Sequence, residues 1–445
     1  MSYLPLDIFD TLLRSHLRSA GTVVILVLCA STLVVWVLQG SESLRSLPSL
    51  AAKTFAFLAI SFLSFNFLTS ARFSSLENLF GGLDRQYKIH KMMGKLTLIF
   101  VVLHLAFLTI NTIPSWFSVL SLYLPGLSLP NTLGIVSLFF LFVLLALTLQ
   151  ARISYSAWLT SHRLMIFPLL FAVVHAMIGG SDIGRYPILR DWVLLVGIVG
   201  IMAYLYTLVL YRYLGPKTRM KVVRVNRHRD LTEVHLEAES KDLVFHPGQF
   251  VFVRFPRFNN AWEMWPFSIS NHPNEKTVRL SIKRLGDFTE GKVPSLKEGD
   301  AAVLMGPYGK YGERYLDHKR DMVWIAGGIG ITPFLSMARN EAEKPIGREV
   351  DLIWAYRDPE EAVYHNELTA EANKSRGLKY HPWLSSEKGR LTAEKVEDLI
   401  GGRERLLGRV IFLCGPLPMM EDLSRGLIKM GVRVRNIVFE DFKLL

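Results

Sequence analysis

Residues 83–104 read LDRQYKIHKMMGKLTLIFVVLH, and the rest of the chain is organised around this stretch. It places His90 and His104 fourteen positions apart in a strongly apolar segment. A later apolar segment carries His162 and His175, thirteen positions apart. In an α-helix these separations correspond to a rise of about 21 and about 20 Å. Because ionisable side chains inside a bilayer usually serve a function, these four histidines are the first candidates for a site.

Two histidines on each of two helices predict two planar cofactors that are held from both sides. Haem with two histidine ligands is the natural candidate. A single histidine on an apolar helix is more often a hydrogen-bonded structural residue. Two pairs with nearly equal spacing are not explained by that alternative, so we predict that all four histidines ligate haem iron.

The first half of the chain contains six apolar segments, each long enough to cross a hydrocarbon core of about 30 Å. They lie at residues 20–39, 50–70, 90–110, 131–150, 160–180 and 191–213. The first segment lacks a small-residue cleavage site and is long for a signal peptide, so it is interpreted as a retained helix. Residues 1–19 are expected to lie on the membrane as an interfacial segment. Residues 113–129 contain two prolines and a glycine, which predicts an interfacial loop.

Basic residues predict the orientation of these segments. Eleven lysines and arginines fall on one side of the membrane and three on the other. Because cytoplasmic loops carry the excess of positive charge, both termini and the second half of the chain are predicted to be cytoplasmic. The third and fifth spans then run in the same direction. This pairs His90 with His162 near the cytoplasmic side and His104 with His175 near the outer side.

The unequal spacing of the two pairs predicts an irregular fifth helix. Fourteen residues return a helix to nearly the same face, which suits His90 and His104. Thirteen residues leave His175 well round the helix from His162. Pro168 lies between them, so we expect a local distortion near this proline.

Composition limits the class of protein. The formal net charge of +12 fits a chain beside an anionic membrane leaflet that binds an anionic nucleotide. No basic run or reader motif indicates a nucleic-acid partner. The two cysteines, Cys29 and Cys414, are too few and too distant for a disulfide framework or a cysteine metal site.

The second half of the chain has the patterns of two soluble domains. Residues 217–318 alternate with the period of strands and are separated by turn residues, which predicts a small antiparallel β-barrel. From residue 319 to 445 strands alternate with helical segments, which predicts a parallel α/β domain. There the strand 322–326 runs into a glycine-rich turn, Gly327 to Pro333.

The glycine-rich turn is compatible with phosphate binding and with a purely structural role. Its glycines let a phosphate approach the backbone, Thr332 can cap the following helix, and Pro333 suits the first turn of that helix. Other motifs favour the binding role. They are His246-Pro247-Gly248-Gln249-Phe250, Trp265-Pro266-Phe267-Ser268-Ile269-Ser270, Lys283 with Gly286-Asp287-Phe288-Thr289, and Cys414-Gly415-Pro416.

Together these motifs resemble the ferredoxin–NADP reductase superfamily. With the histidine spacing and the LDR…HKM run at 83–92, the whole chain resembles the flavocytochrome family of NADPH oxidases and transmembrane ferric reductases, and within it the compact bacterial members. The resemblance implies a six-helix transmembrane domain with two b-type haems at 20–213. It also implies an FAD-binding β-barrel at 217–318 and an NADPH-binding α/β domain at 319–445.

The resemblance also implies roles for individual residues. Ser268 would lie beside the flavin N5, Cys414 beside the nicotinamide, and Phe442 would stack on the flavin, although in the family this aromatic is the last residue of the chain. The residues implied to bind FAD are His246, Pro247, Gln249, Trp265, Pro266, Phe267, Ser268, Ser270, Lys283, Gly286 and Thr289. Those implied to bind the dinucleotide are Gly328, Gly330, Thr332, Pro333, Arg357, Cys414, Gly415 and Pro416.

Two of these positions carry further information. Arg357 follows the second α/β strand, where an arginine suits a 2′-phosphate, so NADPH is favoured while NADH remains the alternative. Trp265 departs from the family, in which a histidine or arginine often stands at this position.

The expected function is electron transfer from cytoplasmic NADPH through FAD and two haems to an acceptor outside a bacterial plasma membrane. The outer loops have few polar residues, which favours dioxygen, giving superoxide, over a ferric chelate. A ferric-chelate reductase of the same architecture is the first alternative. A haem-dependent transporter or channel is the second, but Lys53 is the only charged residue expected well inside a span. No obligate protein partner and no preceding regulatory domain are expected.

Overall fold

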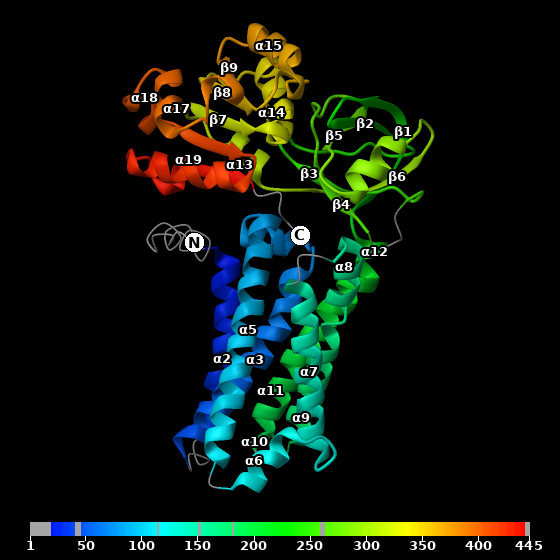
Figure 1. Ribbon diagram of the computed structural model, residues 1–445, viewed down its shortest axis with the longest axis vertical. Helices are drawn as coiled ribbons and strands as arrows, with labels where there is room; N and C mark the ends of the chain where they lie inside the picture. Colours follow the sequence, from blue (N-terminus) through cyan, green and yellow to red (C-terminus); the bar gives the residue numbers. More distant parts are fainter. Residues whose placement is uncertain are drawn as a thin grey trace. The chain divides into compact units, whose positions relative to one another are not determined.

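The computed structural model describes residues 19–40, 46–113, 115–149, 153–179, 182–258 and 263–440. The chain divides into two compact units (Figure 1). One is a helical bundle formed by residues 17–81 and 85–214, and the other consists mainly of residues 215–445.

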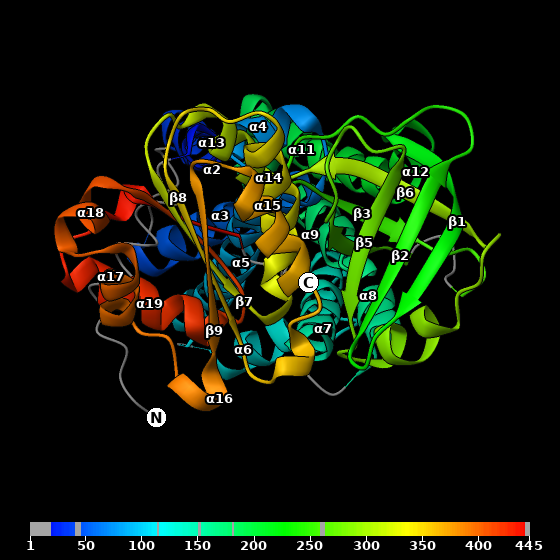
Figure 2. The ribbon, with the colours of Figure 1, turned by 90° about the horizontal axis from the view of Figure 1, so that it is seen from above.

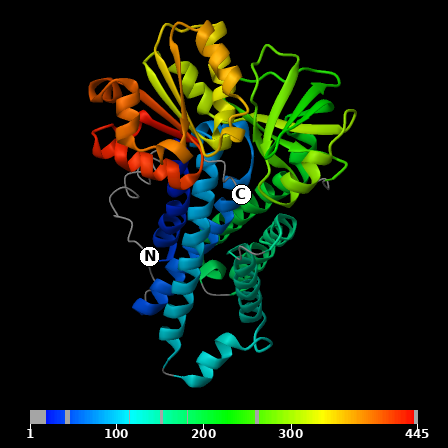
Figure 3. The ribbon, with the colours of Figure 1, turned by 45° about the horizontal axis from the view of Figure 1, so that its top comes forward.

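Among the described residues, six helical segments are long and apolar enough to cross a membrane, which confirms the predicted spans. They are α2 (Ala20–Gly40), α3 (Leu47–Ser70), α5 (Leu83–Thr112), α7 (Leu129–Leu149), the pair α8 (Tyr155–Arg163) and α9 (Ile166–Ile178), and α11 (Pro187–Leu205) with its continuations η2 (Tyr206–Leu210) and α12 (Tyr211–Leu214). Short helices connect them: α4 (Ser74–Phe80), α6 (Trp116–Tyr123) and α10 (Asp182–Arg185). α7 and α9 pack side by side (Figure 3).

The interfacial loop predicted at 113–129 was wrong in its central part, because α6 forms there. Its eight residues contain neither proline nor glycine; the two prolines and the glycine of this segment all lie outside them. Ser115 caps the helix, since its hydroxyl accepts a hydrogen bond from the Ser118 amide at 3.3 Å.

The fifth span is interrupted, as the histidine spacing predicts. α8 ends at Arg163 and α9 begins at Ile166. Between them, the Leu164 and Met165 amides donate to the carbonyls three residues earlier, which is the tighter 3₁₀ pattern. Pro168 is the third residue of α9 and has no N–H with which to continue the α-helical ladder backwards. The tighter turn adds rotation between His162 and His175.

Two glycines of α11 fix how closely the helices approach. A Cβ atom on Gly197 would lie 2.7 Å from the Val173 side chain of α9, and one on Gly200 would lie 2.9 Å from the Ser64 Cα of α3. Small residues of this kind let membrane helices pack backbone against backbone. α3, α9 and α11 therefore form the packed centre of the bundle.

Six antiparallel strands form the first domain of the other unit. They are β1 (Lys217–Arg227), β2 (Leu231–Ala238), β3 (Phe250–Arg254), β4 (Trp265–Ser268), β5 (Thr277–Lys283) and β6 (Ala301–Tyr308). The order is β4-β3-β6-β1-β2-β5, and Figure 2 shows β1, β2, β3, β5 and β6 of this sheet. A bridge between Ile269 and Leu280 brings the two edges together. The predicted β-barrel is confirmed as a nearly closed sheet. It encloses a core that includes Val222, Leu236 and Val251.

A parallel sheet of five strands forms the second domain, as predicted. The strands are β7 (Met322–Gly327), β8 (Val350–Tyr356), β9 (Leu378–Leu384), β10 (Val410–Cys414) and β11 (Ile437–Glu440), in the order β11-β10-β7-β8-β9. α14 (Thr332–Glu343) and α15 (His365–Lys374) cover one face; α17 (Ala393–Ile400), α18 (Arg403–Gly408) and α19 (Leu417–Lys429) cover the other. The chain order reverses between β7 and β10, and this is where ligands bind in open α/β sheets.

Short helical elements complete this unit. They are η3 (Phe288–Lys292), η4 (Val293–Ser295), α13 (Tyr311–Asp317), η5 (Gly328–Ile331), η6 (Pro359–Glu361), α16 (Ser385–Lys388) and η7 (Val434–Asn436).

Candidate cofactor sites

The structure brings His90 and His162 together. Their ring centres are 6.0 Å apart, with 71° between the ring planes. The His90 Nδ1 lies 3.0 Å from the Asn66 carbonyl oxygen, which can only accept a hydrogen bond. The His162 Nδ1 lies 3.2 Å from the Thr148 hydroxyl, whose own hydrogen is donated to the Leu144 carbonyl. In both rings Nδ1 is therefore the donor, and Nε2 keeps its lone pair.

His104 and His175 have the same arrangement. The His104 Nδ1 donates to the Ala52 carbonyl at 2.8 Å, and the His175 Nδ1 donates to the Pro130 carbonyl at 2.7 Å. Gly134 of α7 makes room for His175, since a Cβ atom there would lie 3.1 Å from the ring. Hydrogen bonds of this kind orient metal-bound imidazoles and fix their tautomer.

The His90–His162 pair lies toward the end of the bundle at which its last residue, Leu214, is found. Asn66, whose carbonyl accepts the hydrogen bond from His90, is near the end of α3. The residues that follow α3 contact the sixth span: Phe73 stacks on Tyr206 with ring centres 3.8 Å apart, and the Arg72 guanidinium lies 5.7 Å from the Tyr211 ring centre. From this end the chain continues into the β-barrel.

On β4, Ser268 has an unusual environment. Its side chain is 5% exposed, and its hydroxyl has no hydrogen-bond partner among the described residues. A buried hydroxyl without a partner costs free energy, so a bound group that meets it is expected. Pro266 and Phe267 are half-buried on the same strand, and Trp265 packs on the barrel core, where it stacks on Phe288 with ring centres 4.7 Å apart.

Several other residues that are predicted to contact FAD stabilise turns through hydrogen bonds. The Gln249 side chain accepts a hydrogen bond from the His246 amide at 2.8 Å, and the Gln249 carbonyl accepts one from the Ile269 amide. Pro247 lies between them and is buried. The Thr289 hydroxyl accepts from the Gly286 amide at 3.2 Å and from the Leu285 amide at 2.9 Å.

Ser270 differs from Ser268, because its hydroxyl is fully engaged. It lies 2.8 Å from the Ser281 hydroxyl and accepts from the Arg279 Nε at 3.1 Å. This side chain belongs to a polar network described below.

The glycine-rich turn after β7 meets the segment after β10. A Cβ atom on Gly330 would lie 2.3 Å from the Cys414 carbonyl oxygen, and one on Gly415 would lie 3.0 Å from the Gly327 Cα. Pro416 stands immediately before α19, and Cys414 is completely buried at the end of β10. The structure thus brings the two predicted dinucleotide motifs into backbone contact at the reversal point of the sheet.

The prediction that Thr332 caps α14 was wrong. Thr332 already has helical torsion angles, φ −56° and ψ −46°, and the residue before the helix is Ile331. The Thr332 hydroxyl instead donates to the Ile329 carbonyl at 3.1 Å. The η5 turn places the helix start one residue earlier than a Thr332 cap requires, and Pro333 is in the first turn as expected.

Arg357 follows β8 and is exposed. Its guanidinium makes no hydrogen bond or ion pair with the part of the chain that the structure describes, whereas its amide donates to Glu361 at 3.0 Å. Phe442, the remaining catalytic candidate, lies outside the described residues, as do residues 1–18.

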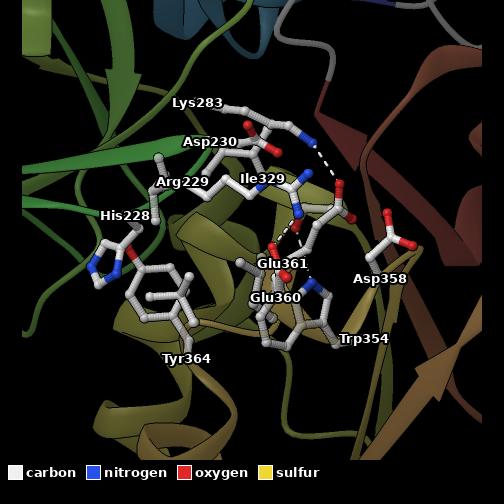
Figure 4. Close-up of a pocket in the computed structure, with 14 residues that line it drawn as sticks. His228, Arg229, Asp230, Lys283, Ile329, Trp354, Asp358, Glu360, Glu361 and Tyr364 are labelled. Carbon is white, nitrogen blue, oxygen red and sulfur yellow. Dashed lines mark hydrogen bonds and ion pairs between the residues drawn. The ribbon is translucent and has the colours of Figure 1, made fainter.

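A pocket lies between the barrel and the α/β domain, and sequence reasoning missed most of its residues. Figure 4 shows Arg229 and Lys283 beside Glu360 and Glu361 in this pocket. The Lys283 ammonium is 3.1 Å from the Glu361 carboxylate. Burial would raise the pKa of Glu361, but the Arg357 amide and the Lys283 charge hold it below its ordinary value. Gly328 lines the same pocket, so predicted FAD and dinucleotide residues meet there.

Known families match three parts of the chain. Residues 55–173 match the ferric reductase like transmembrane component, residues 216–311 match an FAD-binding domain, and residues 324–425 match the oxidoreductase NAD-binding domain. The chain has the domain set of a membrane-bound oxidoreductase. The predicted FAD domain, NAD(P) domain and transmembrane reductase component are thereby confirmed.

Individual relatives match parts of this oxidoreductase. The heavy chain of a superoxide-generating NADPH oxidase from Dictyostelium discoideum is 27% identical over 278 residues, which cover 56% of this chain and 50% of that protein. A flavohemoprotein of the same organism is 28% identical over 209 residues, 44% of this chain and 52% of that protein. The chain thus spans about half the length of these curated relatives.

Among solved structures, a flavohemoglobin from Malassezia yamatoensis with bound FAD and haem aligns with a TM-score of 0.51. The alignment covers 89% of this chain and 96% of that chain at 17% identity. At this identity the likeness shows the fold alone.

Proposed function

We propose that this oxidoreductase carries electrons from NADPH, through FAD and two b-type haems, across a bacterial plasma membrane. The haem domain is residues 20–213, the FAD domain 217–318 and the NADPH domain 319–445, with the last two on the cytoplasmic side. The observation that carries the proposal is that the Nδ1 atoms of four histidines are all held by acceptors of the protein, and that the rings of His90 and His162 lie 6.0 Å apart. A bound FAD would supply two-electron chemistry toward a nicotinamide and one-electron chemistry toward haem, and the residues of the FAD and NADPH domains would hold the two cofactors for it.

The histidine geometry fits a metal ion between paired rings. Bonds between a metal and an imidazole nitrogen are about 2 Å long. The 6.0 Å between the ring centres of His90 and His162 is compatible with two imidazoles that would hold one such ion. Since Nδ1 already donates to the protein, Nε2 is the nitrogen available as a ligand.

Other residues of the chain are proposed to bind and orient the flavin and the dinucleotide. The unpartnered Ser268 hydroxyl supports its role beside the flavin N5. The contact between the Gly327–Gly330 turn and the Cys414–Pro416 segment supports a dinucleotide pyrophosphate site beside the nicotinamide site. The basic residues at the Leu214 end of the bundle, among them Arg85 and Lys91, support a cytoplasmic orientation of that end.

For the acceptor we propose dioxygen, which would give superoxide. The match of residues 55–173 to a ferric reductase component favours a ferric chelate as the second candidate. A channel or transporter is disfavoured by Lys53, whose ammonium lies 2.7 Å from the Asp182 carboxylate. A transport path would need polar residues along several spans, and the charge of Lys53 is already neutralised by its partner.

The test is a dithionite-reduced minus oxidised spectrum of the purified full chain, followed by NADPH in air. The expected result is a pair of b-type haem signals that NADPH also produces. Reduction of cytochrome c that superoxide dismutase blocks would identify dioxygen as the acceptor, whereas resistant reduction of a ferric chelate would identify the alternative. A spectrum without haem bands would contradict the proposal.

Replacing Arg357 with alanine is expected to raise the KM for NADPH by about 10- to 100-fold and to leave the KM for NADH unchanged. The reason is the loss of charge-assisted hydrogen bonds to the 2′-phosphate, which are worth about 1.5–3 kcal/mol. Steady-state kinetics with both nucleotides measures the change. Arg435→Ala is the control, because Arg435 is also exposed but precedes β11, an edge strand that is separated from β8 by β10 and β7. An equal rise for both nucleotides would exclude a phosphate-reading role.

A further inference from the structure

Arg279 joins the barrel to the α/β domain. It lies on β5, and its two terminal nitrogens donate to both carboxylate oxygens of Glu367 on α15, each at 2.8 Å. Two further donors serve the barrel, because Nε donates to the Ser270 hydroxyl and a terminal nitrogen donates to the Ser270 carbonyl at 2.6 Å. The Arg279 side chain is only 12% exposed. Bidentate, charge-assisted pairs of this kind are strong and fix geometry.

A second α/β residue joins the same network. The Tyr364 hydroxyl donates to the Ser281 hydroxyl of β5 at 2.6 Å, and Ser281 is hydrogen-bonded to Ser270. The Arg279 guanidinium also lies over the Tyr364 ring, 5.2 Å from its centre. The segment that follows β8 is thus held to the barrel at two adjacent points, one ionic and one through hydroxyl groups.

The network lies next to the flavin strand. Ser270 is two residues beyond Ser268, and the Ser270 amide donates to the Arg279 carbonyl at 2.9 Å. On its other side, Tyr364 lines the pocket that also contains Gly328 of the dinucleotide turn. The network therefore connects the residue proposed to meet the flavin with the domain proposed to hold the nicotinamide.

The charges in this network are stable. Burial would lower the pKa of Arg279, but its hydrogen bond to Glu367 and the negative charge of that carboxylate raise it above the ordinary value. Burial would raise the pKa of Glu233, which lies 4.0 Å from Arg279, but a hydrogen bond from the Asn226 side chain and the charge of Arg279 lower it. Arg279 therefore keeps its positive charge at neutral pH.

We propose that Arg279 is a positioning residue for hydride transfer, and that its pair with Glu367 sets the separation of the flavin strand from the dinucleotide turn. This inference rests on the proposed function. Hydride transfer requires reacting atoms about 3–3.5 Å apart, and a misplacement of about 1 Å costs on the order of 100-fold in rate. A polar network that fixes two domains within this tolerance would act on the rate and leave the affinity for each cofactor intact.

The experiment uses the FAD-loaded full chain and follows flavin reduction by NADPH in an anaerobic stopped-flow instrument. Glu367→Gln keeps the shape of the side chain and removes its charge. Its flavin reduction rate is expected to fall by about 10- to 100-fold, with a weaker long-wavelength charge-transfer band between nicotinamide and flavin. The FAD content and the Kd for NADPH are expected to stay within about twofold of the parent, because neither binding site loses a contact. Glu367→Asp keeps the charge and should recover part of the rate.

Glu275→Gln is the matched control. Arg339 of α14 and Glu275 of the barrel form a second ion pair between the same two domains, with a 2.6 Å contact, but both side chains are about one-third exposed. Partly exposed pairs contribute little, so this variant is expected to change the rate by less than about twofold. Equal losses in the Glu275 and Glu367 variants would mean general loosening of the contact and would overturn the assignment.

The remaining outcomes separate the two proposals. If NADPH fails to reduce flavin in the parent chain, the proposed function is wrong, and the positioning role is overturned with it. If the parent is active and Glu367→Gln matches it in rate and charge-transfer band, only the positioning role is overturned. A fall explained wholly by lost FAD or weaker NADPH binding also overturns it. Should Glu367→Gln fail to fold, Tyr364→Phe provides the same measurements, because it keeps the ring and removes the hydroxyl that bonds to Ser281 and interacts with Glu233.

Discussion

Replacing His104 with alanine is expected to abolish electron transfer to the outer acceptor while NADPH still reduces the flavin. The Ala52 carbonyl orients the His104 ring, and His175 would remain as the only protein ligand of that pair. Loss of the hydrogen-bonded partner of a ligand alone costs about 10- to 100-fold in metal affinity, so loss of the ligand should cost more. His90 and His162 are untouched, so one of the two haem signals should remain.

The measurement combines the haem content, the reduced-minus-oxidised spectrum and the rate of flavin reduction. Val102→Ala is the control, since Val102 lies on the same helix, two residues away, and its side chain is 46% exposed. This control should retain both haem signals and the full rate. Two intact haem signals in the His104 variant would show that this residue is a structural histidine and would remove it from the ligand set.

Replacing Gly330 with alanine is expected to lower NADPH-dependent flavin reduction by at least about 100-fold. The new Cβ atom would lie 2.3 Å from the Cys414 carbonyl oxygen and 2.8 Å from the Gly415 Cα, where only backbone atoms could give way. Overpacking of this kind typically costs about 1–3 kcal/mol. Here the strain falls on both segments that are proposed to hold the nicotinamide and the pyrophosphate, so binding and orientation should fail together.

Dithionite reduction of flavin and haem in the Gly330 variant should be normal, because the barrel and the helical unit are unchanged. Gly408→Ala is the matched control in the same domain: it is the last residue of α18, and a Cβ atom there would meet nothing within 4 Å. Its rate should equal that of the parent. A Gly330 variant with parental kinetics would show that this turn lies away from the dinucleotide.

Much of the fold could be predicted because it depends on local patterns. The six spans follow from the length of the apolar segments, and the barrel follows from the alternation of residues 217–318. Pro168 predicted the broken fifth span because a proline removes a specific hydrogen bond. α6 was not predicted, because the two prolines and the glycine that flank this short apolar helix indicate a loop. The Thr332 cap was predicted wrongly because a 3₁₀ turn precedes α14 and makes Thr332 the first residue of the helix.

The candidate site also contains residues that could be predicted from the sequence and residues that could not. The histidines could be found because their spacing is visible in the sequence. Their acceptors could not be found, because Asn66, Ala52 and Pro130 act through backbone carbonyls, and any residue type supplies a carbonyl. Arg279 and Glu367 were missed for another reason. They are 88 positions apart and belong to different domains, so each alone resembles an ordinary charged residue on a strand or a helix.

α3 supplies the hydrogen-bond acceptor for one histidine of each pair. The carbonyls of Ala52 and Asn66 are fourteen positions apart, which equals the spacing of His104 and His90 on α5. The two acceptor carbonyls on α3 thus have the same spacing as the two histidines on α5. One residue inserted into α3 between these carbonyls would move one acceptor by about 1.5 Å and turn it by about 100°. Insertions and deletions should therefore be tolerated in the loops of this protein and excluded from residues 52–66.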